Sequence, residues 1–234
     1  KITGSCKTPM GCRSFLPAWR NEQGELVESG RMNLGVVTLN LPRIALESKG
    51  SKDEFWEIFK ERLAICKDAL DYRAKRCGEA KPQNAPILYM HGAFGKRLKP
   101  EDRVKQLFDN KRSTLSLGYI GLYEVASVFY GGDWEKNPEA KEFTLDIMRY
   151  MKECVDKWTE EGDYWYSIYS TPSESLTDRF CRMDTEKFGI VENITDKEYY
   201  TNSYHYDVRK NPTPFEKLDF EKDYPYYASG GFIH

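Results

Sequence analysis

The chain has 234 residues, a net charge of -2 at pH 7 and a mean hydropathy of -0.70. Because it carries no general positive field, it is not expected to bind nucleic acid or acidic lipid surfaces. No apolar run reaches the about 20 residues that a membrane-spanning helix needs, and the amino terminus lacks the apolar segment of a secretory signal. These features predict a globular protein of the cytoplasm.

The cysteines are spread along the chain without any Cys-x-x-Cys pair. They are Cys6, Cys12, Cys66, Cys77, Cys154 and Cys181. A disulfide framework is typical of small secreted scaffolds, which a chain of this size and charge does not resemble. A structural zinc site would need paired cysteines or clustered histidines. The sequence therefore predicts reduced thiols and no metal site within the chain.

The first half of the sequence alternates between strand and helix patterns. Residues 34–41 are β-branched and almost wholly apolar, which favours a strand buried on both faces. Ser51 or Asp53 then caps a long amphipathic helix that extends to about Cys77. Residues 86–90 are predicted to form a second, short strand.

The second half continues this alternation. Its predicted elements are a small and apolar segment at 113–123 that leads into a helix to 130, a helix from 137 to about 162, a strand at 164–169, a helix at 174–183 and an extended segment at 224–229. Strands that alternate with long helices favour a parallel sheet with helices outside it, either open or closed into a barrel.

The loop Thr8-Pro-Met-Gly-Cys-Arg-Ser-Phe-Leu16 is the most informative stretch for function. Glycine and arginine flank Cys12, which favours a tight loop that presents one thiol. Arg13 beside it is suited to favour the thiolate or to bind an anion. A buried structural cysteine in a turn explains the same residues, and composition alone favours that simpler interpretation.

Five short stretches follow one another along the chain. They are Pro9-Met-Gly-Cys-Arg-Ser-Phe-Leu16, Gly30-Arg-Met-Asn-Leu-Gly35 with the strand to Arg43, Ser116-Leu-Gly-Tyr-Ile-Gly-Leu-Tyr-Glu124, Tyr169-Ser-Thr-Pro-Ser-Glu-Ser-Leu176, and Tyr200-Thr-Asn-Ser203. In this order they resemble the anaerobic (class III) ribonucleoside triphosphate reductases. One short match is easily a coincidence, whereas five in the family's order extend over essentially the whole chain.

The resemblance implies a fold and a catalytic role. Residues 1–234 would be a single fragment of the catalytic domain, forming the second half of a ten-stranded α/β barrel with helices outside and a finger loop at about residues 5–20. Cys12 would become the thiyl radical by passing a hydrogen atom to a glycyl radical. Ser14 and Asn33 are the matching candidates for holding the substrate hydroxyls. An asparagine at position 33 also resembles the branch of the family that uses formate as reductant. Without the family, an ordinary asparagine at the start of a strand explains this residue equally well.

The turn after the last predicted strand is a candidate site for the substrate phosphates. Backbone amides and hydroxyls at the start of a helix bind anions. The candidate residues are Ser170, Thr171, Ser173, Glu174 and Ser175. A simple N-cap by Ser173 explains the same residues and is the commoner feature.

The resemblance also implies partners: a ribonucleoside triphosphate substrate, a radical-SAM activating enzyme and a second copy in a homodimer. The family's glycyl-radical motif and zinc cysteines are not found in this sequence, so both are expected elsewhere in the intact protein, and the fragment is not expected to be active alone. Both chain ends are expected to be internal cuts.

Two other functions fit parts of the sequence. A pyruvate formate-lyase-like enzyme has a thiyl cysteine on a similar loop, but its motif does not contain Gly-Cys-Arg-Ser. A non-catalytic α/β scaffold would leave Cys12 structural. Convergence of Cys12, Ser14 and Asn33 on one pocket would separate enzyme from scaffold. His91 and His205 are expected to be structural, and Cys6 is assigned no role.

Overall fold

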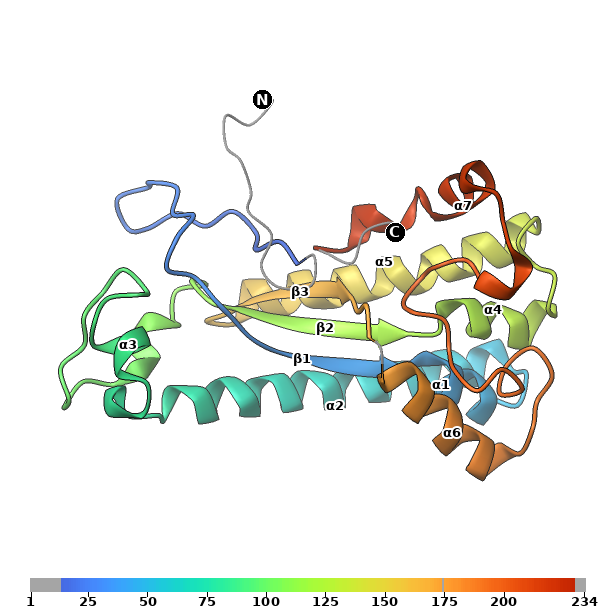
Figure 1. Cartoon of the computed structure of the whole chain (residues 1–234), viewed down its shortest axis with the longest axis horizontal. Coiled ribbons are helices and arrows are strands. Elements are labelled where there is room, and N and C mark those ends of the chain that lie inside the picture. The colour runs from blue at the N-terminus through green and yellow to red at the C-terminus, as the bar shows by residue number, and fades with distance from the viewer. Residues whose placement is uncertain (1–13, 174, 230–234) are drawn as a thin grey trace.

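A computed structural model describes residues 14–173 and 175–229, which form a parallel sheet packed against long helices (Figure 1). The sheet contains β1 (Asn33–Asn40), β2 (Thr114–Ile120) and β3 (Trp165–Ser170) in the order β1-β2-β3, and both pairs are parallel. Between consecutive strands the chain crosses back through helices to the end of the sheet where the previous strand began, as parallel pairing requires. The predicted parallel α/β architecture is confirmed for the described residues.

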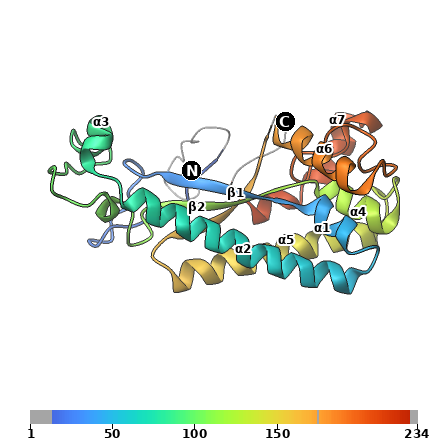
Figure 2. The ribbon, with the colours of Figure 1, turned by 90° about the horizontal axis from the view of Figure 1, so that it is seen from below.

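Two helices cover one face of this sheet: α2 (Lys52–Gly78) and α5 (Pro138–Glu161) (Figure 2). Both begin at side-chain caps, because Ser51 accepts a hydrogen bond from the Glu54 amide and Asn137 accepts from the first amides of α5. The buried positions of α2 recur at intervals of three or four residues: Phe55, Phe59, Leu63, Cys66, Leu70 and Ala74. That spacing places them on the one stripe that faces the sheet.

Shorter elements connect and cover these layers. They are α1 (Leu41–Glu47), α3 (Pro86–Tyr89), α4 (Leu122–Tyr130), α6 (Leu176–Phe188), α7 (Pro214–Glu221) and the 3-10 helices Pro82–Asn84, Val104–Leu107, Val208–Lys210 and Tyr224–Tyr227. None of the helices in the described ranges is long and apolar enough to cross a bilayer.

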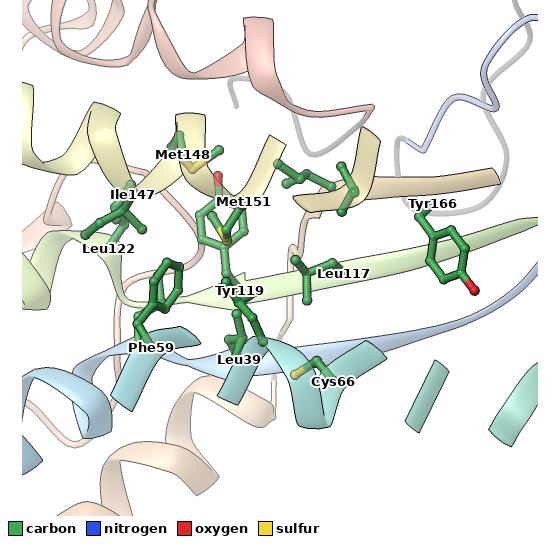
Figure 3. Close-up of a cluster of buried hydrophobic side chains, with 14 of the residues drawn as sticks. Leu39, Phe59, Cys66, Leu117, Tyr119, Leu122, Ile147, Met148, Met151 and Tyr166 are labelled. Atoms are coloured by element: carbon green, nitrogen blue, oxygen red, sulfur yellow. The ribbon is translucent and has the colours of Figure 1, made fainter. Parts of the chain in front are cut away.

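The core lies between the sheet and the two long helices (Figure 3). Leu117 and Tyr119 of β2 point into it and meet side chains from α2 and α5, among them Phe59 and Met151. The Tyr119 hydroxyl is fully buried and hydrogen-bonds with Ser170 Oγ at 2.8 Å. Burial raises the pKa of Tyr119, so this hydroxyl remains neutral.

Three local predictions are wrong. Residues 86–90 begin with α3 rather than a strand, because Pro86 starts a helical turn and the apolar Ile87 is 75% exposed with no strand beside it. Residues 114–120 form the central strand, whereas only a small and apolar segment leading into a helix was predicted. Tyr224–Tyr227 forms a 3-10 helix rather than an extended segment, because Tyr224 is buried in a stack on Tyr204. A three-stranded parallel sheet fits an open sheet as well as an arc of a barrel, so barrel closure stays a prediction.

Candidate active site

Along the central strand β2, the face of the sheet opposite α2 and α5 carries small residues. Successive strand residues point to opposite faces. Because Leu115, Leu117 and Tyr119 of β2 belong to the helix-covered core, Ser116 and Gly118 point the other way. This second face is called here the polar face, and its first residue in chain order is the first residue of β1.

Asn33 lies at that position and reaches across to β2. Its Nδ2 donates to Ser116 Oγ at 2.6 Å, and its Oδ1 accepts from the Gly35 amide at 2.9 Å. The register shifts between Asn33 and Gly35, so the strand bulges where the amide turns onto the polar face. A side-chain amide has two N–H groups and two lone pairs, so one of each stays available to a ligand.

Thr171 meets the same face from the end of β3. A Cβ built on Gly118 would lie 2.4 Å from Thr171 Oγ1 and 2.6 Å from Thr38 Oγ1, so only glycine fits under the two threonines. Gly118 is two residues beyond Ser116, or roughly 7 Å along the strand. The Asn33 side-chain amide and the Thr171 hydroxyl therefore lie on one face, closer together than the span of a nucleotide, about 15 Å or four to five extended residues.

The residues of the turn itself have different environments. Ser170 points into the core toward Tyr119 and is away from the polar face. The Ser173 amide donates to Asn202 Oδ1 at 2.9 Å, and Ser173 Oγ accepts from the Leu176 amide at 3.1 Å. Ser173 Oγ thus binds the first amide of α6, although the N-cap position itself is Ser175, whose side chain makes no capping bond; the Ser173 and Leu176 amides already have protein acceptors. Glu174 lies outside the described residues.

The base of the predicted finger loop is bonded to β3 and to an arginine. Cys12 lies outside the described residues; Ser14, the first residue inside them, is buried. The Phe15 amide donates to Ser229 O at 2.8 Å, and the Ser229 amide donates to Ile168 O of β3 at 2.9 Å. These bonds place Ser14 near this strand edge.

Arg31 also holds the loop base. Its Nη1 donates to Pro17 O and its Nε donates to Arg112 O at 3.1 Å. Burial first, and then the neighbouring Arg112, lower the pKa of Arg31 to about 10. Arg31, Ser116 and Asn202 were all missed as site residues, although each lies inside one of the five motif stretches.

The remaining candidates have structural environments. His205 is buried against Tyr204, and its Nδ1 lies 3.2 Å from Glu221 Oε1, whereas His91 is exposed. Cys66 is in the core, where burial raises the pKa of its thiol to about 11. Within residues 14–173 and 175–229, no three His, Cys, Asp or Glu side chains are grouped as metal ligands would be.

The fold and this face define an α/β protein with a candidate ligand site on a parallel sheet. Comparison with known proteins gives the family. Residues 2–234 match the family model described as anaerobic ribonucleoside-triphosphate reductase. The protein of that name from Salmonella typhimurium is 52% identical over 234 residues, covering 100% of this chain and 33% of the relative. The one from Enterobacteria phage T4 is 47% identical over 238 residues, covering 99% and 38%.

A solved structure agrees in fold. The anaerobic ribonucleotide reductase from Thermotoga maritima with dATP bound in the specificity site has a TM-score of 0.70 and 23% identity, covering 94% of this chain and 35% of that one. The chain therefore belongs to the anaerobic ribonucleoside-triphosphate reductase family. It spans about a third of the length of the curated relatives it matches.

Proposed function

We propose that this chain is the part of an anaerobic ribonucleotide reductase that carries the thiyl-radical cysteine and part of the substrate site. The observation that carries the proposal is the polar face, where the Asn33 amide lies over Ser116 and Thr171 lies over Gly118, two residues further along β2. The activity named for the relatives supports the same reaction. The intact protein is proposed to reduce ribonucleoside triphosphates as a homodimer after activation by a radical-SAM enzyme.

In the proposed reaction Cys12 gives its thiol hydrogen atom to a glycyl radical outside this chain. The resulting sulfur radical takes the hydrogen atom from the ribose 3′ carbon, after which the 2′ hydroxyl leaves as water. Formate supplies two electrons and its hydrogen, which takes the place of the hydroxyl at the 2′ carbon, and leaves as carbon dioxide; the proton that completes the water comes from solvent, and the 3′ hydrogen returns from Cys12. Asn33 is proposed to hold formate or a substrate hydroxyl with the N–H and lone pair that its protein bonds leave available.

The phosphates are proposed to dock at the turn from Ser170 to Ser175. The bonds already made limit how this happens. The Ser173 amide donates to Asn202 and the Thr171 hydroxyl donates to Tyr169 O at 3.3 Å, so the donors left in the described part of the turn include the Ser175 amide, which has no partner among the described residues. Zinc and the glycyl radical are proposed to belong to the missing part of the protein. Within a barrel whose helices lie outside, the polar face would be the inner surface, because α2 and α5 cover the other face.

Substitution of Cys12 in the full-length enzyme tests this function. Cys12→Ser is expected to abolish deoxynucleotide formation while a glycyl radical still forms, because an alcohol O–H bond is too strong for that radical to open. Cys77→Ser is the matched control, since it makes the same change at a half-buried thiol at the end of α2. Activity is measured as deoxynucleotide formed, and the radical by electron paramagnetic resonance. Deoxynucleotide made by the Cys12→Ser enzyme would refute the proposal.

A further inference from the structure

The segment Tyr200–Ser203 connects the end of β2 to the start of α6. On one side, the Gly121 amide donates to Thr201 O at 2.9 Å and the Leu122 amide donates to Ser203 O at 3.0 Å. On the other side, the Tyr200 amide donates to Thr177 O at 3.2 Å, in the first turn of α6. The segment is therefore fixed to a central strand and to the helix that follows the proposed phosphate turn.

Asn202 makes the contact with the turn itself. It forms an isolated antiparallel bridge with Ile120, the last residue of β2, and its Oδ1 accepts the hydrogen bond from the Ser173 amide. Its Nδ2 has no hydrogen bond to any residue that the structure describes. Asn202 and Thr177 both line a cavity of about 390 Å³, so the Asn202 side of this contact borders space that a ligand can enter.

Three buried charged side chains fix the position of this segment through Thr201. Lys197 Nζ contacts Glu124 Oε1 and lies 2.9 Å from Asp207 Oδ2, and all three side chains are buried. Glu124 Oε1 also accepts from the Thr201 amide at 2.9 Å and from Thr201 Oγ1 at 2.7 Å. The residue next to Asn202 is thus bonded to a buried carboxylate whose position Lys197 fixes.

Such a cluster is poorly explained by stability alone. Apolar side chains of similar volume often stabilise a core as well as a buried ion pair does, because three charges lose their hydration on burial. Burial alone would lower the pKa of Lys197, but Glu124 and Asp207 outweigh it and raise that pKa, so the lysine keeps its charge. What the charges supply is one fixed geometry for Thr201 and, through it, for Asn202.

We infer that Asn202 is a positioning residue for substrate phosphates, held in place by the buried Lys197, Glu124 and Asp207. The inference rests on the proposed function, because it assumes that the turn from Ser170 to Ser175 receives the phosphates. By binding the Ser173 amide, Asn202 sets the shape of the turn before substrate arrives. A turn that is already ordered binds its ligand without the entropic cost of ordering.

Kinetics of the full-length enzyme test this inference. Asn202→Ala is expected to raise the KM for a ribonucleoside triphosphate by about tenfold, equivalent to about 1.4 kcal/mol and to one hydrogen bond, with kcat and glycyl-radical content within about twofold. The matched control is Asn137→Ala, which also removes an asparagine Oδ1 from backbone amides, at the start of α5. If Asn202→Ala fails to fold, Thr201→Val is used instead; it keeps the volume and the bond from the backbone amide to Glu124, loses the bond from the hydroxyl, and is expected to raise KM by about threefold.

Each outcome decides one question. A wild-type enzyme that makes no deoxynucleotide would sink the proposed function itself. With an active wild type, an unchanged KM in Asn202→Ala would overturn the inference, and so would a fall in kcat without a rise in KM. An equal rise in KM for Asn137→Ala would also overturn it, because general loosening of the fold would then explain the effect.

Discussion

Replacing Lys197 by Met measures how strongly folding depends on the buried charges. The side chains have similar length, so the main change is the loss of one cation that touches Glu124 and lies 2.9 Å from Asp207. Asp207 keeps Arg209 at 3.1 Å, whereas Glu124 keeps only neutral donors from Thr201. Leaving one buried charge without its partner costs about 3–5 kcal/mol. A whole domain has a stability of only about 5–15 kcal/mol, so the loss is severe.

The pH dependence of this loss separates electrostatics from packing. In the wild type, burial would raise the pKa of Asp207, but Arg209 and Lys197 lower it below its ordinary value. Its contribution is therefore present above about pH 3.9 and is lost as pH falls through the lower folded pKa. Without Lys197, Asp207 loses one of the two cations that lower its pKa, so the folded variant is expected to bind a proton at a higher pH than the wild type does. The free energy lost on substitution then shrinks as pH falls from 7 toward 5, by at most about 1.4 kcal/mol per pH unit for one proton.

Urea unfolding at several pH values provides the assay. Lys197→Met is expected to lower the free energy of unfolding by about 3–5 kcal/mol at pH 7, or the melting temperature by about 6–20 °C. Lys152→Met is the control, because its pair with Asp156 is exposed and is worth less than about 1 kcal/mol. A loss below about 1 kcal/mol for Lys197→Met, or a loss independent of pH, would refute the reasoning.

Two further predictions concern the polar face and a tight turn. Asn33→Ala in the full-length enzyme is expected to leave the glycyl radical intact and to slow formate-dependent reduction by about tenfold. The reason is the loss of about 1.5 kcal/mol of hydrogen bonding in the transition state. An unchanged rate would remove Asn33 from the site. Gly121→Ala is expected to lower the free energy of unfolding in urea by about 2–5 kcal/mol. Gly121 has φ of +81°, and a Cβ there would lie 2.2 Å from Pro42 Cγ. A loss below about 1 kcal/mol would contradict that geometry.

The long helices were predictable because their signals are local. Ser51 and the Asn137-Pro138 pair mark the two starts, and both caps are made by residues within three positions of the first turn. The spacing of three or four residues between the apolar positions of α2 can also be read from its own sequence. The starts of both helices and their apolar stripes are thus encoded locally, so their bounds agree with the prediction to within a few residues.

The central strand was missed because its reasons are not local. Thr114–Ile120 contains Ser116 and Gly118, which have low strand propensity on their own. Ser116 accepts a hydrogen bond from Asn33, and at Gly118 the side chains of Thr38 and Thr171 occupy the space that a Cβ would need. Both reasons come from strands that are distant in sequence. The residues that made the segment hard to predict are those that form the polar face.

The buried charges show which part of such a site a sequence can indicate. Lys197 lies in the run Thr195-Asp-Lys-Glu198, which has the composition of a solvated loop, so nothing local predicts its burial. Glu124 is different: it stands in the first turn of α4 among the buried Leu122, Tyr123, Val125 and Ala126. An acidic residue inside an apolar helical run needs a cation or several donors once that helix packs. The sequence therefore indicates that Glu124 has a buried partner, and only the folded chain, which brings Lys197 back across 73 residues to α4, identifies it.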